Sequence, residues 1–369
     1  MVTDFTAVIY DGPGTEPYFD QVSLRAPKNG ELVLKMTAAG ICHSDLHAVN
    51  GDWPFDHRIS LGHEGTGIVH EVGPDVTDFA PGDHVLLSWF ATCGQCKACL
   101  TGETWLCNRS TTVGNFGPDG ATPIERGTGD EIRPYLGVGT FAEYTLVSRR
   151  SVVKIPDEFP ADVAALIGCS ILTGIGAVLN TAEVKIGDTA LVVGCGGVGQ
   201  AIIMGLELVR ASVIIAIDIN EAQLETARSL GATHVLNGND PDLTAKVIEL
   251  TGGGVDFAFD AIGRTATVAT LPAMVRQGGA TVLVGLPKRD DTAAIPTWIV
   301  AALNQRILGC NYGSSNIQID FPKIAGLFMS GQLPLDRLVE RHVPQSQAIT
   351  ALLDLPRSTG GRTVVDFAL

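Results

Sequence analysis

The sequence has few basic residues, few aromatic residues and no long apolar run. Among its 369 residues, 25 are Lys or Arg and 40 are Asp or Glu, so the formal net charge is −15. A chain of this charge repels polyanions, which excludes nucleic acid and an anionic membrane surface as expected partners. It contains no uninterrupted stretch of ~20 apolar residues and no basic start followed by an apolar segment, as a secretion signal would have. We therefore expect a cytoplasmic protein that acts on small molecules.

The length exceeds the size at which one hydrophobic core stops growing, so two domains are expected. The first 160 residues contain many Gly and Pro residues and short β-type runs, which predicts an irregular, mainly β domain. From about residue 171, short apolar runs alternate with helical stretches, which indicates an α/β fold with a doubly wound parallel sheet. The expected strands of that sheet are Ala190–Gly194, Val213–Asp218, Val255–Asp260, Thr281–Gly285 and Ile307–Cys310.

A glycine-rich turn follows the first of these strands and leads directly into a helical stretch. It has the G-x-G-x-x-G pattern, formed by Gly194, Gly196, Gly197, Val198 and Gly199. A strand, a glycine turn and a helix start together let backbone N–H groups bind a pyrophosphate. Asp218 ends the next strand, 19 residues after Gly199, where a carboxylate accepts hydrogen bonds from ribose hydroxyls and repels a 2′-phosphate. The pattern predicts NAD rather than NADP.

Four cysteines lie close together in the chain, with the spacing C-x2-C-x2-C-x7-C: Cys93, Cys96, Cys99 and Cys107. Four thiolates form a closed tetrahedral zinc site, which has no open position for a substrate and is therefore structural. An iron–sulfur cluster is compatible with the same four residues. A nucleic-acid zinc ribbon fits less well, because the surrounding sequence offers no basic face.

A second set of potential metal ligands is dispersed: Cys42, His63 with Glu64, and Cys169. Taken singly, each is ambiguous, because a lone Cys is often a small buried hydrophobe and a lone His is often a structural residue. Cys195 and Cys310 suggest no role beyond packing.

Together these motifs resemble the medium-chain, zinc-containing alcohol dehydrogenases over essentially the full chain. The resemblance implies a GroES-like catalytic domain at 1–170 and 314–369, with a structural zinc lobe at 90–110, and a Rossmann NAD-binding domain at 171–313. It also implies that Cys42, His63 and Cys169 bind a catalytic zinc and leave one position to substrate, so that each chain holds two zincs. By the same likeness Glu64 is a carboxylate near the zinc, and Asp45 orients His63.

The resemblance further implies reversible hydride transfer between a primary or secondary alcohol and NAD, with zinc as the Lewis acid. Ser44 and His47 match the family's proton relay, and Arg362 matches its pyrophosphate arginine. His43 stands where animal members carry an arginine toward the pyrophosphate, and Gln223 where they carry a lysine, so we expect weaker binding and faster release of NAD. Trp53, Trp89 and Leu286 fall at pocket-lining positions and favour medium-sized, aromatic alcohols.

Three alternatives stay open. A thiol-dependent formaldehyde dehydrogenase and a nicotinoprotein that retains its NAD would share this scaffold. A non-enzymatic NAD- or zinc-binding protein is a remote third, because a degenerate scaffold is expected to lose ligands. The long connection from Asn108 to Val138 resembles that of dimeric members, so a homodimer is expected, with a homotetramer as the alternative.

Overall fold

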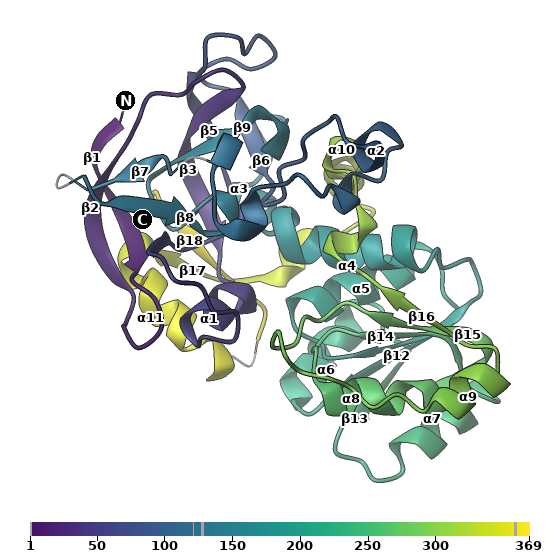
Figure 1. Cartoon of the computed structure of the whole chain (residues 1–369). Helices are drawn as coiled ribbons and strands as arrows, with labels where there is room; N and C mark the ends of the chain where they lie inside the picture. Colours follow the sequence, from purple (N-terminus) through teal and green to yellow (C-terminus); the bar gives the residue numbers. More distant parts are fainter. Residues whose placement is uncertain (1, 121, 127–128, 358–359) are drawn as a thin grey trace. The chain divides into compact units, whose positions relative to one another are not determined.

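A computed structural model describes residues 2–120, 122–126, 129–357 and 360–369 of the chain (Figure 1). The chain divides into two compact units. The first comprises Met1–Cys169, Asn316–Ser358 and Arg362–Leu369, and the second comprises Ser170–Ser315 and Thr359–Gly361. Each unit has its own sheets and its own core.

The first unit is mainly β and contains a small barrel and an open sheet. The barrel closes in the order β1 (Val2–Tyr10), β2 (Tyr18–Leu24), β7 (Ile124–Glu125), β8 (Glu131–Pro134) and β4 (Ile59–Ser60). The open sheet has the order β10 (Val152–Lys154), β6 (His84–Leu87), β5 (Gly65–Val72), β3 (Glu31–Gly40), β18 (Arg362–Asp366) and β17 (Val339–Pro344), and β9 (Tyr144–Ser148) also pairs with β3. The C-terminal strand β18 thus lies against β3, antiparallel to it.

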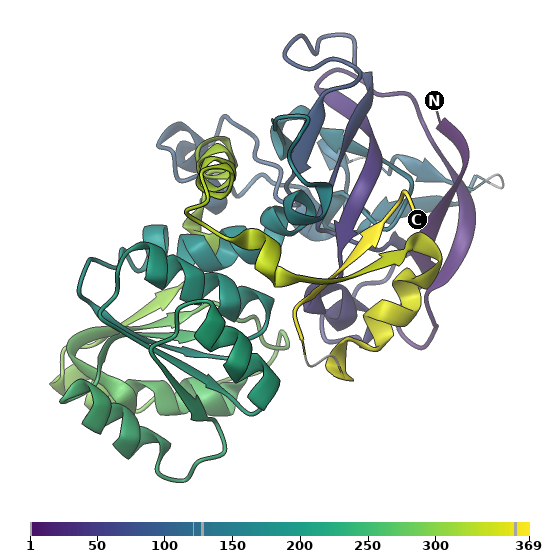
Figure 2. The same cartoon turned by 180° about the vertical axis from the view of Figure 1, so that it is seen from behind.

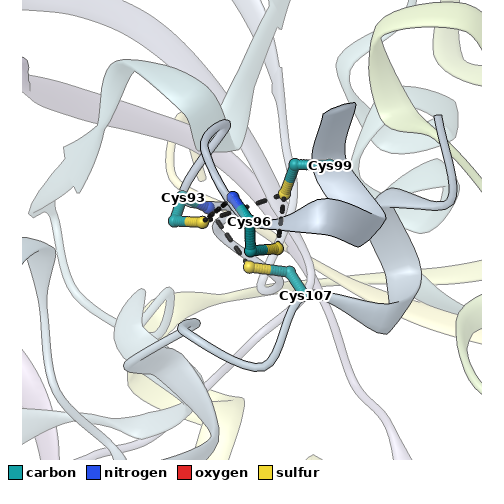
Figure 3. Close-up of side chains that lie close together, drawn as sticks. All are labelled: Cys93, Cys96, Cys99 and Cys107. Carbon is teal, nitrogen blue, oxygen red and sulfur yellow. Dashed lines mark hydrogen bonds between the residues drawn. The ribbon is translucent and has the colours of Figure 1, made fainter. Parts of the chain in front are cut away.

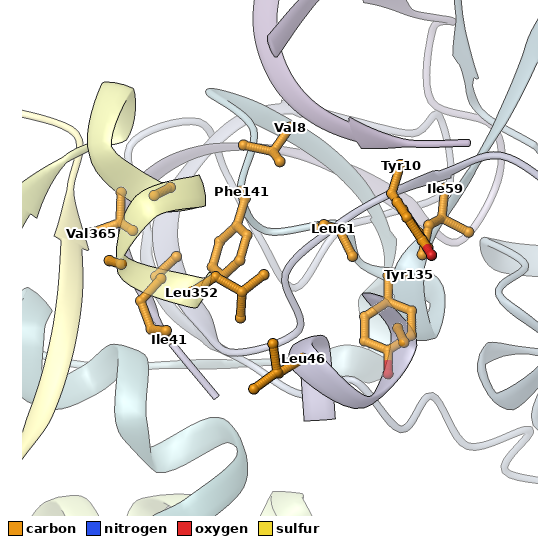
Figure 4. Close-up of a cluster of buried hydrophobic side chains, with 14 of the residues drawn as sticks. Val8, Tyr10, Ile41, Leu46, Ile59, Leu61, Tyr135, Phe141, Leu352 and Val365 are labelled. Carbon is orange, nitrogen blue, oxygen red and sulfur yellow. The ribbon is translucent and has the colours of Figure 1, made fainter. Parts of the chain in front are cut away.

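Short helices connect the strands of the first unit: α1 (His43–Val49), α2 (Lys97–Leu100), α3 (Ala161–Leu166), α10 (Ile317–Met329) and α11 (Ala348–Leu353). Helix α1 is fixed by Leu46, which enters a core cluster with Tyr135 and Phe141 (Figure 4). Leu352 of α11 and Val365 of β18 join the same cluster. Burying these side chains orients the opposite, polar face of α1.

The second unit is a parallel sheet with helices along both sides (Figures 1 and 2). The strand order is β13 (His234–Asn237), β12 (Val213–Asp218), β11 (Thr189–Val193), β14 (Val255–Asp260), β15 (Val275–Leu283) and β16 (Arg306–Gly309). The helices are α4 (Leu172–Gly176), α5 (Gly197–Leu208), α6 (Glu221–Ser229), α7 (Leu243–Thr251), α8 (Thr265–Thr270) and α9 (Thr297–Ala302). Continuous apolar runs such as β12 are expected of strands covered on both faces. The predicted α/β fold class is confirmed.

Two strands of this sheet differ from the sequence expectation. Strand β13 was not among the expected strands, because its four half-buried residues at the sheet edge form no apolar run. Strand β15 begins at Val275, six residues before the expected start, because Gly278 and Gly279 interrupt the apolar pattern without interrupting the strand.

The connection between Asn108 and Val138 contains short helical turns and the strands β7 and β8. Ala121, Gly127 and Thr128 lie outside the described residues. Asn115 adopts a left-handed conformation and accepts a hydrogen bond from the Leu136 backbone N–H at 2.9 Å. Its amide also contacts His57, at 3.2 Å from Nε2. These contacts of Asn115 fix the position of the C-terminal end of the connection. No sequence pattern predicted them.

The helical stretch Ala161–Thr181 is long and apolar enough to cross a membrane by length and composition alone. However, 78% of its apolar window is buried inside the structure. Core helices pass the same test, so the stretch is weak evidence for a membrane span.

Candidate active site

Cys42, His63, Glu64 and Cys169 converge in the first unit, and their potential ligand atoms all lie within 4.8 Å of one another. Cys42 immediately precedes α1 in extended conformation, His63 and Glu64 lie between β4 and β5, and Cys169 lies in the π-helical turn Ile167–Ile171. The tertiary fold therefore assembles one cluster from three segments that are far apart in the sequence.

The donor set fits zinc. Two thiols and an imidazole are ligands that Zn²⁺ prefers, and their number leaves one coordination position open. His63 is fully buried, and its Nε2 makes no hydrogen bond within the described part of the chain. Burying a polar nitrogen without a hydrogen-bond partner costs folding free energy, and a bond to a metal removes that cost. A hydrogen bond from Cys169 holds the pKa of the Cys42 thiol well below its ordinary value, against the effect of burial.

Asp45 contacts the Nδ1 side of the His63 ring. Its Oδ2 lies 3.0 Å from His63 Nδ1, and its Oδ1 accepts a hydrogen bond from the Gly62 backbone N–H at 3.1 Å. Burial raises the pKa of Asp45. Burial lowers the pKa of His63, but the charges of Asp45 and Cys42 outweigh it and raise that pKa well above its ordinary value. This contact directs Nε2 rather than Nδ1 of the imidazole toward the cluster.

Glu64 forms a buried ion pair with Arg362, with 2.6 Å between Oε2 and Nη2. The same guanidinium donates to the Ile41 carbonyl at 2.8 Å. Burial raises the pKa of Glu64 to about 8, against the effect of Arg362. Gly40 makes room for the pair, because a Cβ there would lie 2.1 Å from Glu64 Oε2. The predicted contact of Arg362 with a pyrophosphate stays a prediction.

The predicted relay residues lie on α1. Ser44 is half-buried, and His43 is exposed. The ring of His47 stacks on Trp53, with 4.8 Å between ring centroids, and its Nδ1 lies 2.8 Å from Asp52 Oδ2. Asp52 was not among the residues singled out from the sequence.

Tyr135 is a further residue at this site, and no sequence pattern identified it. Its ring meets His63 edge to face at 5.9 Å, and its hydroxyl donates to the Ser44 carbonyl at 2.7 Å. Burial raises the pKa of Tyr135 well above its ordinary value. Tyr135 follows β8 at the end of the 108–138 connection, where no local pattern indicates proximity to His63.

The three expected pocket residues are distributed over both units. Trp53 covers His47, and Trp89 packs against a core cluster and edge-on against Phe90 at 5.5 Å. Leu286 belongs to the second unit and is exposed.

The four cysteines of the predicted structural site converge around one point (Figure 3). The sulfurs of Cys96 and Cys99 are 3.5 Å apart, and those of Cys93 and Cys99 are 3.9 Å apart. Backbone N–H groups donate to two of the sulfurs, and the bond from Gln95 contributes most to lowering the pKa of Cys93 to about 6. The amide donors and the lowered pKa favour the thiolate form of Cys93, and the four sulfurs lie within 4.8 Å of one another, so these residues fit a closed zinc site.

The glycine turn of the second unit fits a dinucleotide. Gly194 has φ +91°, and a Cβ at Gly199 would lie 1.8 Å from the Gly194 carbonyl oxygen. A Cβ at Gly196 would meet nothing within 4 Å, so the backbone is open to a ligand at the start of α5. The Asp218 carboxylate accepts a hydrogen bond from the Cys195 N–H at 2.7 Å, which fixes it beside the turn. This is the geometry that binds a pyrophosphate and a ribose.

Gln223 is engaged within the protein. Its Oε1 accepts a hydrogen bond from Gln200 Nε2, and its Nε2 donates to the Gly360 carbonyl, both at 2.8 Å. Cys195 and Cys310 are buried, and burial raises the pKa of both thiols.

Comparison with known proteins agrees with this geometry. Residues 28–157 match the alcohol dehydrogenase GroES-like domain, and residues 197–330 match the zinc-binding dehydrogenase family. The chain is 35% identical over 356 residues to S-(hydroxymethyl)glutathione dehydrogenase of Saccharomyces cerevisiae, covering 94% of this chain and 92% of the relative. It is 34% identical over 364 residues to the NDMA-dependent alcohol dehydrogenase of Amycolatopsis methanolica, covering 97% and 98%.

Among solved structures, benzyl alcohol dehydrogenase from Acinetobacter calcoaceticus superimposes with a TM-score of 0.91 at 29% identity, covering 99% of both chains.

Proposed function

The chain belongs to the zinc-dependent medium-chain alcohol dehydrogenases, and from this premise we propose that its substrate alcohol is oxidised at the cluster of Cys42, His63 and Cys169. It is an oxidoreductase of alcohols whose cofactors are zinc and NAD. The observation that carries the proposed site is the buried Nε2 of His63, without a hydrogen-bond partner among the described residues, beside two thiols.

The site residues of the first unit have different proposed roles. Cys42, His63 and Cys169 would hold the catalytic zinc, and Asp45 would keep the His63 ring in its ligating orientation. When bound, zinc acts as a Lewis acid on the substrate oxygen, and NAD accepts the hydride. Glu64 would remain close to the metal, held by its contact with Arg362.

The proton of the alcohol needs a route out of the site. The Ser44 hydroxyl would accept it from the substrate hydroxyl, and His47 would pass it to solvent, since imidazole exchanges protons near neutral pH. The side chain of His47 is 29% exposed, which supports contact with water.

The glycine turn from Gly194 to Gly199 would bind the pyrophosphate of NAD, and Asp218 would accept hydrogen bonds from its ribose. His43 and Arg362 are the proposed additional contacts to the phosphates. Gln223 is neutral and its amide is engaged with Gln200 and Gly360, so it attracts the phosphates and ribose of the cofactor less than a lysine would. This supports faster release of NAD than in a lysine-bearing relative.

Trp53, Trp89 and Leu286 are proposed to line the substrate channel and to favour aromatic primary alcohols, since indole faces stack on aryl rings. The likeness to benzyl alcohol dehydrogenase supports this choice. The test is NADH formation at 340 nm with ethanol and benzyl alcohol. We expect the higher kcat/KM with benzyl alcohol, and a clear ethanol preference would contradict the proposal.

Two relatives suggest variants of this reaction. The likeness to S-(hydroxymethyl)glutathione dehydrogenase favours an adduct of formaldehyde and a thiol as substrate, and the likeness to NDMA-dependent alcohol dehydrogenase favours retained NAD. Turnover with formaldehyde that requires glutathione or mycothiol identifies the first variant. NADH that remains with the protein after gel filtration identifies the second.

We propose a homodimer that pairs along the edge strand β16, with a tetramer as the alternative. The edge position of β16, the exposed Ile307 on it and the exposed Trp298 on α9 support this surface. Light scattering after size exclusion measures the assembly, and Ile307→Lys is expected to yield monomers. All eight cysteines are free, which agrees with the proposed cytoplasmic location.

A further inference from the structure

After helix α1 the chain folds back against the last turn of that helix. Gly51 has φ +74°, and its N–H donates to the Ala48 carbonyl at 3.2 Å, while the Asp52 N–H donates to the His47 carbonyl at 3.0 Å. These two bonds and the left-handed glycine form a Schellman motif. In this motif the residue after the glycine is hydrogen-bonded to the residue five positions earlier in the chain. Asp52 therefore lies next to His47.

The side chains of this pair form a second contact. His47 Nδ1 lies 2.8 Å from Asp52 Oδ2, and the side chains are 29% and 10% exposed. Trp53, the next residue, stacks on the imidazole with an interplanar angle of 25°. The ring is therefore fixed in its plane by a carboxylate and covered on one face by an indole. Its Nε2 makes no hydrogen bond to any described residue.

A carboxylate beside one nitrogen of an imidazole decides which tautomer is present. An ionised Asp accepts hydrogen bonds only, so it selects the tautomer with hydrogen on Nδ1 and leaves a lone pair on Nε2. When Nε2 takes up a proton, the negative carboxylate stabilises the imidazolium that forms. The backbone hydrogen bond from the Asp52 N–H to the His47 carbonyl neither selects a tautomer nor stabilises the imidazolium, because it does not involve the ring.

We propose that Asp52 is a positioning residue for proton release: it holds His47 in the tautomer whose Nε2 accepts the proton of the alcohol. The inference rests on the proposed function, in which this proton passes through Ser44. The O–H bond of the substrate breaks, an N–H bond forms at Nε2, and the hydride goes separately to NAD. The imidazolium then gives its proton to a water molecule and returns to the neutral Nδ1–H form.

The test compares three variants of the zinc- and NAD-containing enzyme. Asp52→Asn keeps the size of the side chain and the backbone turn but can donate to Nδ1, which favours the wrong tautomer. Asp52→Glu retains the charge and serves as a second variant. The matched control is Asp56→Asn, which removes a fully exposed carboxylate 3.3 Å from the Nδ1 of another histidine, His57.

The first readout does not depend on turnover. Long-range ¹H–¹⁵N spectra of histidine-labelled enzyme report the tautomer of each ring, and loss of one signal set in His47→Gln assigns His47. We expect the Nδ1–H form in the wild type, in Asp52→Glu and in Asp56→Asn, and a shift toward the Nε2–H form in Asp52→Asn.

The second readout is kcat/KM for alcohol oxidation. We expect Asp52→Asn to lose about tenfold, Asp52→Glu to recover part of it, and Asp56→Asn to match the wild type. Because Asp52 acts through His47, Asp52→Asn should cause no further loss in a His47→Gln background. Three results would overturn the inference and leave the proposed function standing. They are an unchanged His47 tautomer in Asp52→Asn, wild-type kcat/KM in Asp52→Asn, and losses that multiply when Asp52→Asn and His47→Gln are combined. Wild-type turnover in His47→Gln would instead overturn the proposed proton route, and this inference with it.

Discussion

Gly196→Ala should weaken NAD binding without harming the fold, whereas Gly199→Ala should harm the fold itself. A Cβ at Gly196 meets nothing within 4 Å, and its φ of −72° suits any residue. The methyl group would project from the open backbone where the pyrophosphate is proposed to bind. Losing one hydrogen bond to that charged group costs about 1.5–3 kcal/mol, which raises the Kd of NAD about 10- to 150-fold.

The contrast with Gly199 comes from backbone contacts. A Cβ at Gly199 would lie 1.8 Å from the Gly194 carbonyl oxygen and 2.9 Å from its carbon, and neither atom can rotate away. Relieving such an overlap costs about 1–3 kcal/mol of folding free energy. Gly196→Ala instead restricts the unfolded chain, which stabilises by about 0.4–1 kcal/mol. It also replaces glycine at the N-cap of α5, where alanine is less favourable by a similar amount, so stability should stay nearly equal.

Titration calorimetry with NAD and urea unfolding measure the two effects separately. We expect Gly196→Ala to lose affinity at unchanged unfolding midpoint, and Gly199→Ala to unfold at lower urea concentration. Wild-type affinity in Gly196→Ala would refute the assignment of the pyrophosphate to this turn. Wild-type stability in Gly199→Ala would refute the packing argument.

Three further predictions concern the second unit. Asp218→Gly should narrow the preference for NAD over NADP, because like charges brought together cost several kcal/mol; equal kcat/KM ratios before and after would show that Asp218 does not select the cofactor. Gln223→Lys should slow NAD release in stopped-flow traces by adding a positive charge near the ribose, and an unchanged or faster off-rate would count against it. Burial raises the pKa of Asp260 from 3.8 to about 6, so the native state binds its proton more tightly than the unfolded state and ionisation costs stability. The free energy of unfolding of Asp260→Asn relative to the wild type should therefore rise by about 2 kcal/mol between pH 4 and pH 6, and a flat difference over this range would contradict the burial argument.

The features that the sequence predicted best are those encoded within short segments. The glycine turn needs only the spacing of Gly194, Gly196 and Gly199 between a strand and a helix, and the cysteine lobe needs only four sulfurs within one loop. Strand β12 is predictable because every residue before its last, Asp218, is apolar.

Features that depend on tertiary contacts were not predictable in this way. Tyr135 reaches His63 from a connection that is fixed by Asn115 and His57, and nothing near Tyr135 in the chain indicates that contact. The pairing of Glu64 with Arg362 joins residues 298 positions apart. The contact between His47 and Asp52 is local, but it requires recognising Gly51 as the left-handed residue of a helix end.

The central claim is that Cys42, His63 and Cys169 hold a zinc at which the alcohol is oxidised. The most direct test is zinc content by plasma mass spectrometry, with NADH formation at 340 nm, for the wild type and His63→Ala. We expect two zincs per chain in the wild type, one in the variant, and loss of alcohol oxidation with the missing zinc. One zinc in the active wild type, or two zincs and full turnover in His63→Ala, would contradict it.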